Sequence, residues 1–340
     1  MIKERRDKRI LLAHGSGGKL SYELIEEVFA PYFENPILNQ FNDQAILPIE
    51  GIDLAFSTDT YVVSPIFFPG GDIGKLAICG TVNDLAMGGA IPLYLSVGFI
   101  LEEGFPVGDL KKILRSMAEA AKEAKVTIVT GDTKVVNKGS ADGIFINTTG
   151  IGVRKKGIDI GGDKARVGDK VIVSGFIGDH GMAILLMREG LEFQGEVKSD
   201  CAPLNRLVSQ MLDTSSNIHV LRDPTRGGVA TVLNEIALRS LVGIRLEEEK
   251  IPVREEVKAA CEILGLDPLY LANEGKLLAI VGKEDAEKIL ETIKNNPYGK
   301  NAEIIGEVVE DYPRKVFMKT RIGGTRLVDM LVGEQLPRIC

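Results

Sequence analysis

The most unusual reactive group in this sequence is a thiol on its last residue, Cys340. A structural cysteine needs a packed environment, and a disulfide needs a partner held at fixed geometry. A chain end offers neither, because its backbone is free to move. The pattern therefore predicts a mobile thiol that visits more than one site. The alternative is a frayed end that tolerates a cysteine by accident.

Acidic residues recur at the ends of predicted elements in the first half of the chain. Asp43 lies in a turn, Asp59 closes a strand, and Asp84 lies toward the end of a helix. Carboxylates gathered from separate turns hold Mg²⁺ beside phosphate oxygens, because the small ion prefers oxygen ligands and keeps several waters. The pattern predicts such a site if these turns meet in space. Taken singly, each aspartate is also explained as a cap or turn residue.

Three glycine-rich segments are candidates for nucleotide-binding motifs. Segment 14–19 can bring backbone N–H groups close to an anion, but it lacks the spacing of a P-loop. Pro69 stands where segment 70–75 would need a glycine for the same match. Segment 175–181 has the spacing G-x-x-G-x-x-G and lies mid-chain, with no clear acidic ribose ligand about twenty positions later. A P-loop fold and NAD binding are both disfavoured.

Further candidate groups lie in short turns. Segment 131–134 follows a predicted strand and supplies Lys134, which can neutralise phosphate charge. Segment 222–228 combines an aspartate, two arginines and a glycine turn ahead of a helix, as in an anion contact. Segment 273–276 can place the carboxylate of Glu274 over a cleft. Each of these, taken alone, is also explained as structural.

Composition narrows the class of protein. The 340 residues are 44% hydrophobic, with a formal net charge of −7 and a pI near 5.3. This balance argues against a general nucleic-acid binder, and the basic run 3–9 is interpreted as a solvated arm. The four cysteines form no C-x-x-C pair and no cluster with the three histidines, so reduced thiols are expected. No apolar run reaches the length of a membrane span and no signal peptide is recognised, which predicts a soluble, cytoplasmic protein.

Periodicity predicts the elements that must position these groups. In the first half, strands are expected at 53–58, 93–100, 126–129 and 143–151, with helices at 74–87 and 108–125. After a break at 153–157, we expect strands near 168–175, 276–281 and 302–309. Helices are expected near 180–188, 228–239, 253–264 and 283–295. The periodic pattern stops after Lys319.

This order predicts an α/β or α+β protein with two domains. The expected divisions are an arm with a glycine-rich loop (1–40), an N-terminal ATP-binding α/β domain (41–153), a C-terminal α/β domain (154–320) and a mobile tail (321–340) that ends in the reactive cysteine.

Read together, these segments resemble the ATP-using superfamily that contains aminoimidazole ribonucleotide synthetase and selenophosphate synthetase. Within it, the chain is most similar to the HypE family of hydrogenase maturation proteins, which are carbamoyl dehydratases. The resemblance covers nearly the whole chain and rests on segments 14–19, 56–65, 70–89, 131–136, 178–181, 223–228, 273–276 and 337–340. It implies a two-domain PurM-like fold whose N-terminal domains pair in a homodimer, with ATP near the dimer interface.

The resemblance also implies roles for individual residues. Asp43, Asp59, Asp84 and Asp223 would neighbour Mg²⁺ and phosphate. Other implied nucleotide contacts are Lys75, Asn83 and Asp132, with Lys134 meeting phosphate or the reacting amide, and Glu274 acting as a base or orienting carboxylate. Cys340 would be the catalytic carrier, and its own α-carboxylate is expected to raise the pKa of its thiol.

The implied reaction begins when a HypF-type carbamoyltransferase places a carbamoyl group on Cys340. ATP then phosphorylates the carboxamide oxygen, and loss of phosphate leaves a protein-bound thiocyanate. The cyanide would pass to the iron of [NiFe] hydrogenase through a HypC–HypD complex. A superfamily enzyme acting on a diffusible substrate and a non-catalytic assembly factor are the competing hypotheses. The resting position of the tail, the base, the permanence of the dimer and the hydrogenase served are left open.

Overall fold

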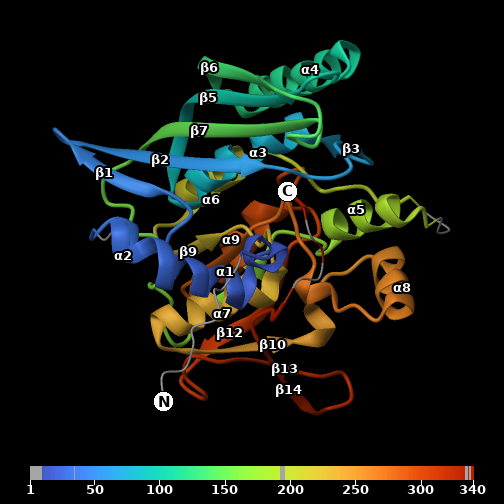
Figure 1. Ribbon diagram of the computed structural model, residues 1–340. Coiled ribbons are helices and arrows are strands. Elements are labelled where there is room, and N and C mark those ends of the chain that lie inside the picture. The colour runs from blue at the N-terminus through green and yellow to red at the C-terminus, as the bar shows by residue number, and fades with distance from the viewer. Residues whose placement is uncertain (1–9, 34, 192–195, 334–335, 337) are drawn as a thin grey trace, which may run out of the picture.

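The computed structural model describes residues 10–33, 35–191, 196–333, 336 and 338–340. The basic run 3–9 and Pro337 of the C-terminal motif lie outside the described residues. Two sheets, each with its own helices, form two domains that pack against each other, and the end of the chain lies between them (Figure 1). Among the described residues, no helix combines the length and the apolar character needed to cross a membrane.

The N-terminal domain is a five-stranded sheet covered on one face by helices. Its strand order is β1-β2-β7-β5-β6, and only β5 and β6 run parallel. Helix α3 is buried along almost its whole length, and Asp72 caps its start by accepting from the backbone of Gly74 and Lys75 at 2.7 and 3.0 Å. The elements are β1 (Ala45–Ile49), β2 (Ile52–Tyr61), β3 (Phe67–Phe68), β4 (Gly71–Asp72), α3 (Ile73–Met87), β5 (Ala90–Glu102), α4 (Val107–Ala124), β6 (Thr127–Val136) and β7 (Ile144–Arg154).

The C-terminal domain is a seven-stranded sheet with helices on both faces. Its order is β14-β13-β10-β12-β8-β11-β9, with β10 and β13 parallel. Alternate residues of β8 and β11 pack against α7 on one face and against α6 and α9 on the other. The elements are β8 (Lys170–Val173), α5 (Asp179–Glu189), α6 (Asn205–Thr214), β9 (Ile218–Arg222), α7 (Gly228–Ser240), β10 (Gly243–Glu247), α8 (Glu255–Leu264), β11 (Leu278–Val281), α9 (Ala286–Lys294), β12 (Glu303–Val309), β13 (Val316–Lys319) and β14 (Thr325–Val328), with one-turn helices η4 (Glu248–Lys250) and η5 (Pro268–Tyr270).

The described part of the segment expected as an arm and glycine-rich loop, residues 10–33 and 35–40, is mostly helical and folds onto the C-terminal domain. Lys19 donates its backbone N–H to Leu331 at 3.0 Å, and Arg226 donates to the carbonyl of Gly15 at 3.2 Å. Gly17 adopts a φ of +77°, and a Cβ there would lie 2.8 Å from Cβ of Arg226, so the glycine permits this contact. The elements are η1 (Leu12–Gly15), α1 (Gly18–Leu24), η2 (Ile25–Phe29), α2 (Ala30–Phe33) and η3 (Leu38–Gln40).

Two predictions of local structure were wrong. Segment 131–134, predicted as a turn after a short strand, lies inside β6, which continues to Val136. Gly131 sustains the strand because a side chain there would meet the carbonyl of Val97 at 2.4 Å. Periodic structure also continues past Lys319, since Thr325–Val328 forms β14 and pairs antiparallel with β13. The first error arose because Gly131 was treated as the end of a strand.

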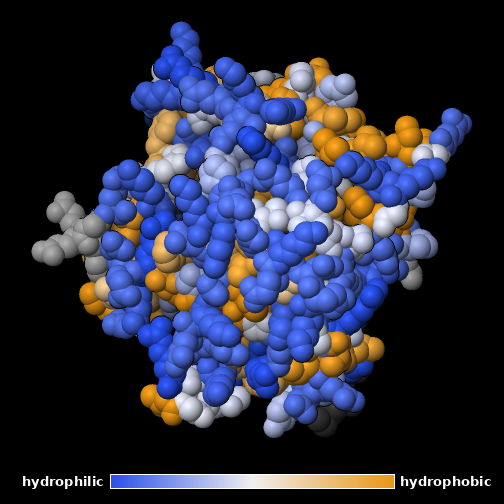
Figure 2. All heavy atoms as spheres, turned by 180° about the vertical axis from the view of Figure 1, so that it is seen from behind, coloured by the Kyte–Doolittle hydropathy of each residue, from blue (hydrophilic) through white to orange (hydrophobic). Residues whose placement is uncertain are grey.

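The face of the N-terminal sheet opposite α3 and α4 has no covering element among the described residues. Large apolar side chains are exposed on this sheet, and Figure 2 shows hydrophobic residues gathered where its strands and the β1–β2 hairpin lie. Lys134 pairs with Ile100 of β5, so the two share this face. Its exposed apolar members include Ile52, Phe56, Tyr94 and Ile100.

Candidate active site

A cavity of about 510 Å³ lies between the two domains and is bounded by the N-terminal helices. That volume is typical of a small-molecule site. The cavity collects residues from segments far apart in the sequence. Its acidic and thiol members are Asp43, Asp59, Asp84, Asp223, Glu235, Glu274 and Cys340. Six of the ten site residues predicted from sequence therefore come together here.

Separate elements deliver the four aspartates. Asp43 precedes β1, Asp59 lies in β2, Asp84 lies in α3 and Asp223 follows β9. Ser57 ties two of them together, because its hydroxyl contacts Asp84 Oδ2 at 2.7 Å and the backbone carbonyl of Asp43 at 3.0 Å. The expected meeting of acidic turns is thus produced by the packing of β2 on α3.

Burial and mutual repulsion raise the pKa values of these carboxyl groups. Desolvation raises the pKa of Asp43 to about 6, although Arg222 opposes the shift. Desolvation and the charge of Asp43 raise the pKa of Asp223 to about 7. The pKa of Asp84 is raised well above its ordinary value by burial and then by Asp223, Asp59 and Asp43. A low-dielectric group of like charges is an arrangement that a bound cation relieves.

Two arginines complete the charge balance. Arg222 lies 2.8 Å from Asp43 through Nε and 3.1 Å from Glu235 through Nη2. Arg226 lines the same cavity, and the charge of Cys340 is the main influence that raises its pKa. The sequence marked both arginines as an anion contact. Glu235 was missed because, as a polar residue within α7, it carried no motif signal.

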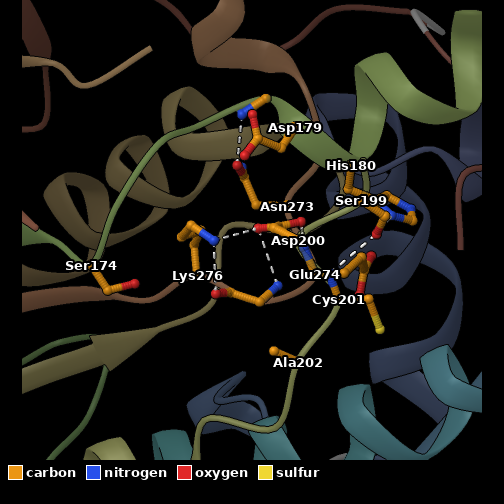
Figure 3. A network of polar contacts seen from close by, with 12 residues as sticks. Ser174, Asp179, His180, Ser199, Asp200, Cys201, Ala202, Asn273, Glu274 and Lys276 are labelled. Atoms are coloured by element: carbon orange, nitrogen blue, oxygen red, sulfur yellow. Dashed lines mark hydrogen bonds and ion pairs between the residues drawn. The ribbon is translucent and has the colours of Figure 1, made fainter. Parts of the chain in front are cut away.

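Hydrogen bonds to its backbone hold Glu274 in place, whereas one oxygen of its carboxyl group has no polar partner. Asp200 accepts the backbone N–H groups of Glu274 and Gly275 at 3.0 and 3.2 Å, and Lys276 Nζ at 3.2 Å (Figure 3). The carboxyl group of Glu274 is buried and its Oε1 has no hydrogen-bond partner. Burial is the main reason that its pKa is raised well above the ordinary value. Such a carboxyl group is poised to exchange a proton.

The described end of the tail is docked inside the cavity. Ile339 is only 4% exposed and belongs to the core of the N-terminal domain, and Cys340 is packed against that core. Burial is the first cause of a raised pKa at the Cys340 thiol, opposed by Arg226 and reinforced by Glu274 and two aspartates. The thiol therefore lies within the acidic group of the cavity, and the tail rests in its inward position.

The other four predicted site residues do not line this cavity. Lys75 donates from Nζ to the carbonyl of Gly70 at 3.1 Å, in the first turn of α3. Asp132 and Lys134 form an ion pair of 3.1 Å on β6, the opposite edge strand from β1. Their side chains are about 70% exposed. Within one chain, three strand spacings of about 4.8 Å separate β6 from β2.

Asn83 connects the two domains. Its amide nitrogen donates to the carbonyls of Ala202 and Glu274 at 3.1 and 3.3 Å, and its oxygen accepts from Leu204 N at 2.7 Å. The side chain is 1% exposed, so no solvent replaces these partners. This arrangement places the backbone of Glu274 relative to α3.

Replacing Asn83 by alanine is expected to lower the free energy of unfolding by about 1–3 kcal/mol, because buried backbone groups lose their partners. Urea denaturation followed by circular dichroism measures this loss. Nucleotide affinity, measured by calorimetry well below the unfolding transition, should change much less. A variant with normal stability and abolished nucleotide binding would contradict the connecting role.

The donor set of the cavity fits Mg²⁺ bound together with phosphate. Carboxylate oxygens are the ligands that the ion prefers, and it usually takes one or two carboxylates, phosphate oxygens and water. Among the described residues, no group of three or more histidine, cysteine or acidic side chains is arranged to hold a metal ion. The aspartates of the cavity therefore suit a shared site with a phosphate ligand.

The raised pKa values predict how Mg²⁺ dependence varies with pH. Because the pKa values of Asp43 and Asp223 are higher in the folded than in the unfolded protein, protonation of these groups favours the folded state. Their contribution to the free energy of unfolding is complete below the unfolded pKa of about 3.9, and it is lost as pH rises through about 6 at Asp43 and about 7 at Asp223. Mg²⁺ requires the ionised groups. The rise in melting temperature caused by Mg²⁺ and ADP should therefore be larger at about pH 8 than at about pH 6.

Thermal unfolding with and without Mg²⁺ at both pH values tests this expectation. ADP alone serves as the control for titration of the nucleotide. An increment that stays constant or shrinks as pH rises would mean that these aspartates do not receive the cation.

Comparison with known proteins matches both domains. Residues 41–154 match the N-terminal domain, and residues 166–319 the C-terminal domain, of the AIR synthase related protein family. Carbamoyl dehydratase HypE of Azotobacter vinelandii is 56% identical over 335 residues, which cover 98% of each chain. The carbamoyl dehydratase HypE of Escherichia coli is 50% identical over 336 residues, covering 97% of this chain and 99% of its own.

Two solved structures are similar to this chain over most of its length. A chain in a HypE–HypF complex is 56% identical, with a TM-score of 0.87, covering 91% of this chain and 99% of its own. A hydrogenase maturation protein HypE in complex with ATP is 53% identical, with a TM-score of 0.83, covering 98% of this chain and 100% of its own.

Proposed function

The chain belongs to the HypE family of carbamoyl dehydratases within the AIR synthase-related proteins, and from this premise we propose that Cys340 carries the group that is dehydrated. The protein is a carbamoyl dehydratase of hydrogenase maturation and a partner of HypF. The observation that carries the proposal is the placement of Cys340 in the acid-lined cavity. A thiol so placed can present its cargo to ATP bound beside the aspartates.

The reaction converts an S-carboxamide into a thiocyanate at the expense of ATP. The carboxamide oxygen attacks the γ-phosphorus, the bond to ADP breaks, and phosphate then leaves with that oxygen. The two amide protons are released as the C≡N bond forms. Oxide is too poor a leaving group for this to occur without phosphorylation. Asp43, Asp59, Asp84 and Asp223 would supply the carboxylates that share Mg²⁺ with phosphate oxygens and water, and the ion would neutralise phosphate charge when bound.

Residues around the thiol account for proton removal, for the charge near the reacting group and for the position of Glu274. Glu274 is assigned the amide protons, because a carboxylate of raised pKa is a stronger base than an ordinary one. Arg226, the cation that lowers the pKa of the Cys340 thiol, is placed to offset negative charge near the reacting group. Asp200 and Asn83 position Glu274 through its backbone.

Loading and unloading require other proteins. A HypF-type carbamoyltransferase would place the carbamoyl group, and a HypC–HypD complex would accept cyanide for the iron of [NiFe] hydrogenase. The raised pKa of the docked thiol keeps it protonated and poorly nucleophilic in the cavity. Because the docked thiol also lies in the cavity between the domains, we infer that loading takes place with the tail outside.

Intact-protein mass spectrometry tests the proposed function directly. The full chain is incubated with HypF and carbamoyl phosphate, with the ATP that loading requires, and then freed of HypF. A carboxamide adduct should convert to a cyano adduct only when Mg²⁺ and fresh ATP are added. Localisation of either adduct to another residue would overturn the assignment to Cys340.

Lys134 fits this reaction only if two chains pair. Its side chain shares the uncovered sheet face with Ile100, whereas Asp59 pairs with the buried Thr148 on the covered side. We propose that the uncovered faces of two chains pack together, because exposed apolar residues on this scale mark an interface. Two-fold pairing can bring β6 of one chain toward the β1–β2 edge of the other.

Lys134→Ala is expected to stall the reaction at the carboxamide, and mixing distinguishes the chain in which Lys134 acts. Chains bearing Lys134→Ala are mixed with chains bearing Cys340→Ala and allowed to exchange. If Lys134 serves the partner's cavity, the mixed dimers should form the cyano adduct on the Lys134→Ala chain. No recovery after proven exchange would mean that Lys134 does not act across the dimer, and normal conversion by Lys134→Ala alone would remove its role.

A further inference from the structure

The last described residues lie along the segment that follows β2, as a short additional strand would. Val62 N donates to a main-chain carboxylate oxygen of Cys340 at 3.0 Å, and Ser64 N donates to the carbonyl oxygen of Arg338 at 3.2 Å. The guanidinium of Arg338 returns a bond from Nε to the carbonyl of Val62 at 2.9 Å and contacts Asp142. These contacts bind the main chain of the tail to the N-terminal domain.

Helix α5 of the C-terminal domain holds the same peptides from the other side. His180 Nε2 lies 2.8 Å from the carbonyl oxygen of Ile339. Arg188 donates from Nη2 to the carbonyls of Arg338 and Ser64 at 3.1 and 2.5 Å, and from Nε to Ser64 at 3.1 Å. Arg188 thus joins the tail to the strand segment beside it.

The contacts of His180 fix which of its nitrogens carries the proton. Burial lowers the pKa of His180, so the ring is neutral. The carbonyl of Ile339 can only accept, so Nε2 is the donor, and Nδ1 accepts from Ser199 Oγ at 2.8 Å (Figure 3). Ser199 in turn accepts from Cys201 N at 3.1 Å, and Phe68 packs edge-to-face on the ring at 5.5 Å. The ring is therefore oriented before the tail arrives.

We propose that His180 and Arg188 are positioning residues that bind the Arg338 and Ile339 carbonyls and thereby set Cys340 in the cavity for dehydration, an inference that rests on the proposed function. Both contacts are to backbone carbonyls upstream of the sulfur. They are consequently independent of whether Cys340 carries a free thiol, a carboxamide or a thiocyanate. The same contacts withdraw the thiol from an external carbamoyl donor.

Because of this dual role, weakening the contacts should change the rates of carbamoylation and dehydration in opposite directions. Weakening the contacts raises the fraction of time that the tail spends outside, which favours carbamoylation by HypF. It lowers the fraction of carboxamide held in the cavity, which slows dehydration. A residue that acts only by maintaining the fold would slow both. A hydrogen bond from a charged donor is worth enough to change such a population about tenfold.

The experiment compares Arg188→Ala, Arg188→Lys and His180→Gln with the wild type, as full-length chains. Arg254→Ala is the matched control, because Arg254 pairs with Asp179 of α5 at 2.9 Å and lies over the ring of Phe176 rather than against residues 338–340. Carbamoylation by HypF and single-turnover dehydration of the purified carboxamide form are followed separately by mass spectrometry. Hydrogen exchange at Val62 and Ser64, together with alkylation of Cys340 by iodoacetamide, reports tail docking without any catalysis.

In Arg188→Ala we expect dehydration about tenfold slower, carbamoylation at least as fast, faster alkylation of Cys340 and lost protection at Val62 and Ser64. Arg188→Lys should recover part of the difference, and Arg254→Ala should resemble the wild type. Equal slowing of both half-reactions, or unchanged exchange and alkylation, would overturn the proposal. If Arg188→Ala fails to fold, Arg188→Lys and His180→Gln decide by the same criteria. Absence of adducts in the wild type would refute the proposed function, while exchange and alkylation would still test the docking site.

Discussion

Cys340→Ala is expected to abolish both the carboxamide and the cyano adduct while nucleotide binding is retained. In the proposed reaction, the thiolate sulfur of Cys340 is the atom to which the carbamoyl carbon bonds, so no neighbouring group can replace it. The nucleotide is expected to contact the aspartates instead, and these come from separate elements that do not depend on the tail. Mass spectrometry after incubation with HypF, carbamoyl phosphate and ATP measures the adducts, and calorimetry with ADP and Mg²⁺ measures binding.

Cys261→Ala is the matched control for the loss of a thiol. Cys261 lies in α8, is 2% exposed and packs in a separate apolar cluster, so its removal should leave both adducts intact. Adducts that persist in Cys340→Ala, or that vanish in Cys261→Ala, would show that the reactive sulfur has been misassigned. Cys340→Ala is also expected to lower the melting temperature slightly, because Cys340 is packed against the N-terminal core.

Glu274→Gln is expected to slow dehydration by about 100- to 10,000-fold and leave the carboxamide form accumulated. Glutamine keeps the size of the side chain but cannot take a proton. The Asp200 contacts use the backbone N–H groups of Glu274 and Gly275, so the local structure should survive the change. Single-turnover conversion of the purified carboxamide form measures the effect.

The pH profile gives Glu274 a second test. Burial raises its pKa well above the ordinary value, and a base works in its ionised form. The rate of dehydration should therefore rise with pH over a range above the usual titration of a glutamate near 4.3, and Glu274→Gln should lose this dependence. Glu307→Gln, which alters a carboxylate paired with Lys170 in the C-terminal sheet, is the control. A residual rate near the wild-type value in Glu274→Gln would remove it as the base.

Much of the fold followed from local patterns. The helix expected at 74–87 is α3 (Ile73–Met87), and the helix expected at 108–125 is α4 (Val107–Ala124). One error arose at Gly131, where the residue keeps a strand close to its neighbour rather than ending it. The helices of 10–33 were missed because the apolar residues of η2 remain exposed, those of α1 are only partly buried, and their spacing gives a weak periodic signal.

The sequence by itself determined the chemical inventory: a thiol at Cys340, acids in separate turns, and a match to a known family along nearly the whole chain. These are properties of residue type and spacing. Tertiary structure decided which of them meet. Strand pairing set Lys134 on the opposite sheet face from Asp59, and packing of α3 turned Asn83 toward the second domain. It also placed Cys340 inside the cavity, because contacts between residues 338–340 and residues 62, 64, 180 and 188 span distances in sequence that no local pattern encodes.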